Sequence, residues 1–433
     1  MNMTRQEKVL LLILACINFT HIVDFIIMMP MGPQLMRYFS LNPHEFSFIV
    51  SAYSLSAGIS GFLAAFYVDR FDRKKVVLTA YIGFVVGTIA CGLAPTFPLL
   101  IVARTTAGLF GGVLGAQVFS IVADVVPYER RATAMSIITT SFSVASVVGV
   151  PFGLYLATKI SWHAPFLAIG GLGVLVTALI IRYVPRLNGH LQTSENQSAP
   201  LDVITSILRN PNQLRALWLT TTIMLGHFSI IPLLSPYLVA NVGLGEDQLY
   251  LIYLVGGLVT IFTGPLVGRL ADKRGKYPVF VVFALLSMIP MFLLTSMQPS
   301  GLTYILAVNA VFFIFSNARF IPTQAMVTAV VEPKRRGGFM SMNSSVQLLA
   351  QALATYGAGL LVTKTESGAL IHYSWVGYLA MAAIFVSVFI ARRIRPVDTD
   401  AGESAVVNTT RPDLADEKRI PENRSVEATP TVS

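Results

Sequence analysis

Charged side chains are scarce within the apolar stretches of this sequence, and the few that occur there are the residues best suited to chemistry. Asp24 is the only one of the 22 acidic residues that falls inside such a stretch, and Arg104 and Arg319 are the two basic residues that do so. A charge surrounded by hydrocarbon is costly, so charges of this kind commonly mark the path of an ion or a substrate. We therefore expect a functional site around these three residues.

Asp24 and Arg104 lie at similar depths in two different apolar stretches. At about 1.5 Å of rise per residue, Asp24 is roughly 22 Å from the start of its helix and Arg104 roughly 11 Å from the opposite end of its own, in an apolar layer about 30 Å thick. The two side chains can therefore pair. Arginine favours an ionised carboxylate and burial favours a protonated one, so opening of the site to either side would shift the balance. We interpret Asp24 as a proton site and Arg104 as its modulator, with a static ion pair as the alternative.

Further polar side chains could titrate or bind a substrate. His227 lies at a depth comparable to that of Asp24. An ordinary histidine pKa of about 6.5 would suit a second titrating group. The alternative is that His227 only forms a hydrogen bond within the bundle. Arg319 could bind an anionic part of a substrate or backbone carbonyl groups. We expect a substrate cavity lined by His21, Asn309, Arg319, Gln324, Gln347 and Gln351. Each of these side chains could instead hold helices together.

The elements that position these residues must be membrane-spanning helices. The chain has 433 residues, of which 54% are hydrophobic and 12% are charged, and its mean hydropathy is +0.67; soluble domains carry about 25% charged residues. Stretches of about 20 apolar residues cross a bilayer as helices. The sequence predicts an all-α membrane protein with twelve transmembrane helices at 9–36, 45–68, 76–94, 97–123, 132–158, 163–184, 214–240, 248–270, 277–297, 302–330, 337–363 and 374–394.

The distribution of basic residues predicts the orientation of these helices. Of the 31 lysine and arginine residues, 26 fall on the side of the N-terminus, and only Arg37, Lys159 and Lys364 fall on the other side. Basic loops stay in the cytoplasm. We therefore expect both termini to be cytoplasmic in a bacterial inner membrane, and we attribute the net charge of +9 to topology and not to nucleic-acid binding.

The chain is expected to divide into two related halves. The predicted parts are a six-helix half at 1–184, a cytoplasmic loop at 185–212, a second six-helix half at 213–395 and a disordered cytoplasmic tail at 396–433. A shift of about 203 to 205 positions aligns the two halves, and it places Asp24 on His227. Parallel six-helix repeats are typical of a large class of secondary transporters.

Loop and helix motifs carry a family resemblance. Gly268 to Lys276 reads GRLADKRGK, and the equivalent segment from Ala65 to Lys74 keeps its charges but has Ala65 and Asp72 where glycines are usual. These segments resemble the loop signature of the major facilitator superfamily. The resemblance implies a cytoplasmic gate or latch formed by Asp69, Arg70, Arg73, Asp272, Lys273 and Arg274. The structural alternative is that these charges only anchor the ends of the helices.

Two glycine-rich segments strengthen the resemblance. Arg104 is followed by glycines in the fourth predicted helix, and the fifth contains GVPFG, similar to the signature of drug and metabolite antiporters. Such residues let helices approach closely or bend. The residues expected at hinges or close helix contacts are Gly108, Gly112, Gly149, Pro151 and Gly153, with ordinary helix packing as the alternative.

The resemblance implies a bacterial proton-coupled efflux permease for drugs, sugars or metabolites, driven by the proton gradient without a cofactor or metal and acting as a monomer. Uptake by symport or facilitated diffusion is the nearest alternative, and a non-transporting membrane receptor is a further one. An enzyme is not expected, because the sequence contains no HExxH, no Gly-x-Ser-x-Gly and no P-loop.

Overall fold

The computed structural model describes residues 4–64, 66–187, 200–332 and 335–397. The described chain is a bundle of helices, with one short antiparallel hairpin formed by β1 (Thr363–Lys364) and β2 (Leu370–Ile371). Most of the predicted tail and part of the predicted central loop lie outside the described residues. A short amphipathic helix, α10 (Pro200–Arg209), lies within the described part of that loop.

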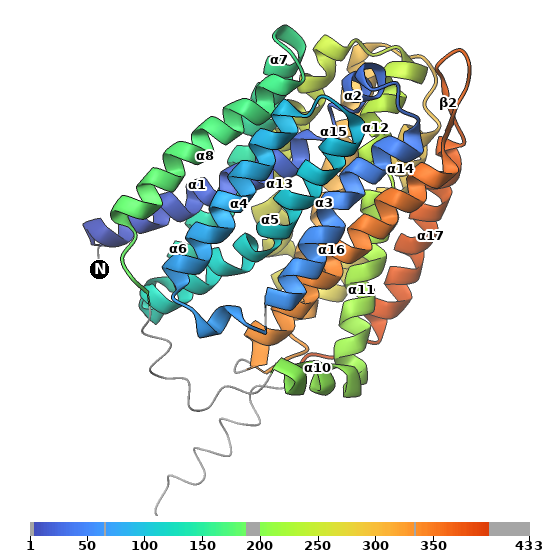
Figure 1. Cartoon of the computed structure of the whole chain (residues 1–433). Helices are drawn as coiled ribbons and strands as arrows, with labels where there is room; N and C mark the ends of the chain where they lie inside the picture. The colour runs from blue at the N-terminus through green and yellow to red at the C-terminus, as the bar shows by residue number, and fades with distance from the viewer. Residues whose placement is uncertain (1–3, 65, 188–199, 333–334, 398–433) are drawn as a thin grey trace, which may run out of the picture.

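The first half contains six membrane-spanning segments, and three short pieces interrupt or join them (Figure 1). Its elements are α1 (Arg5–Ile27), α2 (Gly32–Tyr38), α3 (Pro43–Ala64), η1 (Val68–Arg70), α4 (Arg73–Leu93), α5 (Phe97–Val125), α6 (Tyr128–Val144), the π-helix η2 (Ala145–Gly149), α7 (Val150–Lys159) and α8 (His163–Tyr183).

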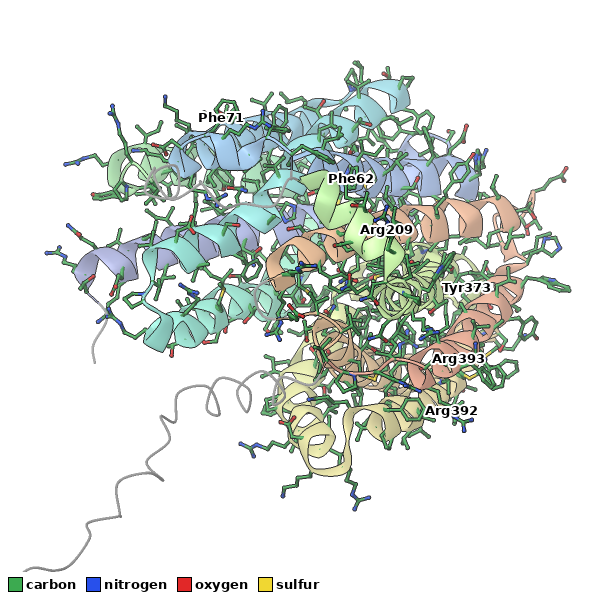
Figure 2. The ribbon with its side chains drawn as sticks, turned by 90° about the horizontal axis from the view of Figure 1, so that it is seen from below. Phe62, Phe71, Arg209, Tyr373, Arg392 and Arg393 are labelled. Carbon is green, nitrogen blue, oxygen red and sulfur yellow. The ribbon has the colours of Figure 1, made fainter. Side chains whose placement is uncertain are left out.

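The second half repeats this order. Its elements are α11 (Pro211–Phe228), α12 (Ile231–Tyr237), the π-helix η4 (Leu238–Val242), η5 (Glu246–Gln248), α13 (Leu249–Arg274), α14 (Lys276–Thr295), α15 (Leu302–Thr328), α16 (Arg336–Leu361) and α17 (Tyr373–Arg392). Seen from below in Figure 2, the blue and cyan helices of the first half and the yellow and red helices of the second lie on different sides, and the orange α16 reaches the first half.

Eleven segments of the described chain are long and apolar enough to cross a membrane. The twelfth span is α16, which has 26 residues but carries amide and hydroxyl side chains along its length. It packs against α3 of the first half and α11 of the second. The predicted architecture of twelve helices in two six-helix repeats is therefore confirmed.

The first helix of each half is broken, whereas hydropathy predicts continuous helices over 9–36 and 214–240. The break in the first half lies at 28–31, and the break in the second half follows Phe228. Pro30 lies within the first break, and Pro232 lies at the start of α12. Proline lacks an N–H donor and clashes with the preceding turn, so it ends a helix. The prediction of continuity was wrong because a hydropathy window averages across such breaks.

The helix predicted over 132–158 is also irregular. The π-helix η2 lies between α6 and α7, at the glycine that opens the GVPFG segment. A π-bulge adds a residue to one helical turn, and such bulges are frequent at functional sites. The irregular turn faces α1 and α13, so it lies where the two halves meet.

The contacts between the two halves include those of α3 with α16, of α2 and α3 with α12, and of η2 and α7 with α13. Phe25 and Phe228 contact each other across this interface with ring centroids 6.4 Å apart. We call the end of the bundle where α1 begins and α17 ends the terminal end, and the other the distal end. The interface places the helices that carry Asp24 and His227 at the centre of the molecule.

Candidate functional site

The structure brings Asp24 and Arg104 together in the first half. Arg104 Nη1 donates a hydrogen bond to Asp24 Oδ2 at 2.9 Å and lies 3.4 Å from the Asp24 carbonyl oxygen. Both residues are fully buried. Within the described chain, Asp24 Oδ1 and Arg104 Nε have no hydrogen-bond partner. The pair thus has a free acceptor and a free donor, which a proton or a polar substrate group could use.

Residues from three helices surround this ion pair. The guanidinium of Arg104 lies over the ring of Tyr53, 4.4 Å from its centroid, in a cation–π contact. Thr88 of α4 lies beside the Asp24 carboxylate, and His21 lies one turn before Asp24 on α1. The Tyr53 hydroxyl and His21 Nε2 are buried without a hydrogen-bond partner among the described residues. The result is a compact group of titratable and hydrogen-bonding side chains.

Glycines allow the helices around the pair to approach closely. A Cβ atom on Gly108 would lie 2.1 Å from Ser56 Oγ and 2.4 Å from the carbonyl oxygen of Tyr53, and one on Gly112 would lie 2.1 Å from the carbonyl oxygen of Ala57. Both contacts hold α5 against α3. These distances are too short for any side chain, so glycine at these positions places Arg104 next to Tyr53.

The GVPFG segment packs against α1 beside Asp24. A Cβ atom on Gly149 would lie 2.4 Å from Val23 Cγ2, and one on Gly153 would lie 2.8 Å from Ile27 Cδ1. Pro151 is buried at the start of α7. Gly149 and Gly153 therefore contact the helix that carries Asp24, while a role of the segment in bending stays a prediction.

The second half places a different set of side chains at the equivalent position. His227 stacks on Phe312 with ring centroids 5.9 Å apart, and its Nδ1 has no hydrogen-bond partner in the described chain. It lies close enough to Arg319 for their charges to interact. With the repeat shift of 205, Arg104 falls on Asn309, which donates to the carbonyl oxygen of Ile305 at 2.8 Å. The acid–base pair of the first half therefore has no copy in the second.

Arg319 is fully buried and poorly neutralised. Its Nη1 donates to Ser287 Oγ at 2.7 Å, and its Nε and Nη2 have no hydrogen-bond partner among the described residues. No carboxylate of the described chain forms an ion pair with it. A buried guanidinium with two free donor groups is suited to an anionic or carbonyl-bearing ligand.

The predicted amide side chains are less closely connected. Asn309 and Gln351 are buried, whereas Gln324 and Gln347 are half-buried. In the described part of the chain no hydrogen bond joins the side chains of these four residues to Arg319. Asn343 instead accepts a hydrogen bond from Thr220 Oγ1 at 2.7 Å, which ties α16 to α11. Their part in a substrate cavity remains a prediction.

The charges of the predicted latch lie at the terminal end. Arg73 is largely buried, and its Nε donates to Asp124 Oδ2 at 3.0 Å within the first half. Arg70 is exposed, as are Asp272, Lys273 and Arg274, and the side chain of Asp69 lies outside the described residues. The predicted pairing of these charges between halves stays a prediction for another conformation.

A pair at the distal end was not predicted. Arg37 of α2 forms a bidentate ion pair with Glu246 of η5, with one of its two hydrogen bonds 3.0 Å long. The hydrogen bonds that Arg37 donates to the Glu246 carboxylate raise the pKa of Arg37. Among the ion pairs of the described residues, this is the one that joins the two halves. The sequence indicates Arg37 as one of the few distal cations, whereas Tyr53, Thr88, Ser287 and Glu246 carry no local signal and were not predicted.

Twelve spanning helices in two repeats, with a buried ion pair inside the first repeat, define a multi-pass membrane transporter. The sequence profile of the Major Facilitator Superfamily matches residues 14–315 and 216–412. The chain belongs to this superfamily.

Known proteins support the same assignment. The MFS-type transporter YceJ of Bacillus subtilis (strain 168) is 25% identical over 376 residues, which cover 84% of this chain and 92% of YceJ. YbcL of the same organism is 26% identical over 348 residues, covering 79% and 85%. The D-xylose-proton symporter has the same fold, with a TM-score of 0.73 at 16% identity over 90% of this chain and 98% of its own. An inward-facing, unoccupied bacterial homologue of the human lysosomal transporter Spinster gives a TM-score of 0.68 at 17% identity over 90% and 96%.

Proposed function

We propose that this protein exports a small molecule, such as a drug, a sugar or another metabolite, in exchange for protons. The observation that carries the proposal is the sealed Asp24–Arg104 ion pair at 2.9 Å. Asp24 lies one turn before the break between α1 and α2, where movement of the distal segment would change its access to water. A carboxylate with one free oxygen and a cationic partner can hold or release a proton as its surroundings change.

The exchange cycle follows from competition at this pair. With the site open to the outside, a proton neutralises Asp24 and Arg104 loses its counter-charge, so a substrate held through Asp24 leaves. With the site open to the cytoplasm, the proton leaves and Asp24 again attracts either Arg104 or the substrate. Export is favoured over uptake by the GVPFG segment, which contacts α1 next to Asp24.

The orientation of the cycle rests on the charges at the two ends. The excess of basic residues at the terminal end favours a cytoplasmic location for both termini in a bacterial inner membrane. The Arg37–Glu246 pair would then close the outer face, so the conformation described above would open inward. In the outward-open state the terminal charges around Asp69 and Asp272 would form the latch instead. The proton gradient supplies the energy, and a monomer suffices.

Symport is the second candidate, because the D-xylose-proton symporter shares the fold. The two mechanisms move protons in opposite directions relative to the substrate. In proteoliposomes without an imposed gradient, entry of substrate by antiport acidifies the outer medium, whereas entry by symport makes it alkaline. The sign of the change distinguishes them whatever the orientation of the protein in the bilayer.

The experiment uses a panel of lipophilic cations, sugars, nucleosides and amino acids, with a pH-sensitive dye outside the vesicles. We expect acidification with at least one class of compound and none with the Asp24→Asn variant. Asp247→Asn, which removes an exposed distal carboxylate, is the matched control and should behave as the wild type. Alkalinisation of the outer medium would indicate symport and refute export. A signal from Asp24→Asn equal to that of the wild type would refute the role of Asp24.

A further inference from the structure

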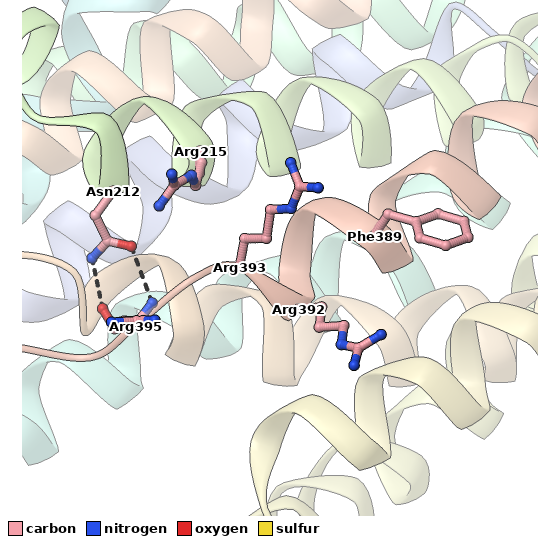
Figure 3. Close-up of a pocket in the computed structure, with 6 residues that line it drawn as sticks. All are labelled: Asn212, Arg215, Phe389, Arg392, Arg393 and Arg395. Atoms are coloured by element: carbon pink, nitrogen blue, oxygen red, sulfur yellow. Dashed lines mark hydrogen bonds between the residues drawn. The ribbon is translucent and has the colours of Figure 1, made fainter.

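A cavity at the terminal end of α11 and α17 is lined almost entirely by arginine. It has a volume of about 600 Å³, and its lining residues are Asn212, Arg215, Phe389, Arg392, Arg393 and Arg395 (Figure 3). All four arginine side chains are exposed. No carboxylate from the described chain lines the cavity, so its wall carries four arginines without a counter-charge.

The backbone around the cavity is held by specific hydrogen bonds. Asn212 Nδ2 donates to the carbonyl oxygen of Arg395 at 2.6 Å, and the backbone N–H of Arg395 donates to Asn212 Oδ1 at 3.0 Å. Asn210 caps the same end of α11. These contacts tie the segment after α17 to the start of α11. The arginines therefore project from a fixed frame and not from a free loop.

An exposed aromatic ring lies about one helical turn from an arginine of the cavity on each of the two helices. Trp218 is 62% exposed and follows Arg215 by three residues on α11, while Phe389 is 56% exposed and precedes Arg392 by three residues on α17. Residues three apart share one face of a helix. Each helix thus presents an exposed aromatic ring about one turn deeper in the bundle than its arginine. Tryptophan in particular collects at membrane interfaces.

The chemistry of the lining points to a phosphate group. A guanidinium offers planar, paired N–H donors that match the oxygens of a phosphate, and it remains charged at any physiological pH. A free anion in water would need only the charged part of the cavity. The aromatic flank adds an apolar surface that suits acyl chains, and basic pockets between membrane helices are suited to anionic lipid headgroups.

We propose that the cavity formed by Arg215, Arg392, Arg393 and Arg395 binds the headgroup phosphate of an anionic phospholipid, whose acyl chains lie against Trp218 and Phe389. The lipid would join α11 to α17, the first and last helices of the second half. The site is separate from Asp24 and Arg104, so its occupancy can be measured independently of transport.

The test measures lipid binding to the purified full-length protein by native mass spectrometry. Phosphatidylglycerol and phosphatidylcholine are titrated in turn. We expect phosphatidylglycerol to bind the wild type at least about tenfold more tightly, and the triple variant R215Q/R392Q/R393Q to lose about tenfold or more of that affinity, since each arginine near an anionic headgroup contributes about fivefold. The matched control R186Q/R269Q/K276Q removes three exposed basic residues at the same end and should bind as the wild type does.

Several results would overturn the proposal. Equal binding of both lipids, or an equal loss in the triple variant and its control, would show that general surface charge is responsible. Displacement of phosphatidylglycerol by millimolar inorganic phosphate would assign the cavity to a soluble anion. If the triple variant does not fold, the single variants Arg392→Gln and Arg393→Gln carry the test, with an expected loss of about fivefold each; unchanged affinity in both would refute the site.

Discussion

Separating the effects of Asp24 and Arg104 on stability gives the sharpest test of the site. Coulomb's law with an effective dielectric constant of about 20 gives an attraction of about 6 kcal/mol for unit charges 2.9 Å apart. Removing one partner of a buried pair typically costs about 3–5 kcal/mol, because the other charge stays buried and unpaired. We expect a loss in this range for Arg104→Met. Asp24→Asn should cost somewhat less, because its amide oxygen can still accept a hydrogen bond from Arg104.

The double variant D24N/R104M should be less destabilised than the two single losses together. The double variant has no unpaired charge at this site. We therefore expect a coupling free energy between Asp24 and Arg104 of at least about 2 kcal/mol. Equilibrium unfolding in mixed micelles measures all four proteins. The pair Arg37–Glu246 provides the control, because the Arg37 side chain is 68% exposed and such pairs contribute about 1 kcal/mol or less. A coupling below about 0.5 kcal/mol for Asp24 and Arg104 would refute the sealed ion pair described above.

Three further predictions concern other parts of the bundle. Glu246→Gln should weaken the exposed contact with Arg37 by about 0.5–1 kcal/mol. Hydrogen exchange of the backbone amides in α2 should then become about two- to fivefold faster. An unchanged exchange rate would show that the pair does not hold the distal end closed. Gly108→Ala should lower the free energy of unfolding by about 1–3 kcal/mol, because the added Cβ would meet the backbone of α3. Gly115 faces open space, so Gly115→Ala should leave the free energy of unfolding unchanged. Equal losses for the two variants in thermal unfolding would contradict the packing argument. Arg319→Met removes a buried charge that has no ionic partner in the described chain, so stability should be kept or raised while transport of anionic compounds in vesicles is lost; unchanged anion transport would exclude Arg319 from binding.

The arrangement of the helices was predictable from the sequence because it depends on hydropathy and repetition. Depth alone placed Asp24 opposite Arg104, since a helix has a fixed rise per residue and a membrane a fixed thickness. The irregular turns were not predicted, although Pro30 marks one of them, because an apolar window of about 20 residues averages over a break of four. The amides of the second half were predicted as a group, yet their partners depend on helix rotation, which composition does not determine.

Contacts between the halves were the least predictable feature. Arg37 and Glu246 are 209 residues apart in sequence, and neither lies in a recognisable motif. Their pairing depends on how α2 and the segment before α13 fold back over the distal end. Tyr53 likewise gave no local signal, because its contact with Arg104 exists only where Gly108 lets two helices touch. Such contacts follow from packing and not from periodicity.

The polarity of α16 has a consequence for how the chain enters the membrane. Without this helix the number of spans is odd, and the two ends of the protein would emerge on opposite sides of the bilayer. A segment with so many amide and hydroxyl groups partitions weakly into lipid alone, and its insertion gains most once α3 and α11 can cover its polar face. The ribosome synthesises α3 and α11 before α16. Whether the protein acquires an even number of spans therefore depends on helices that are already in the membrane when α16 leaves the ribosome.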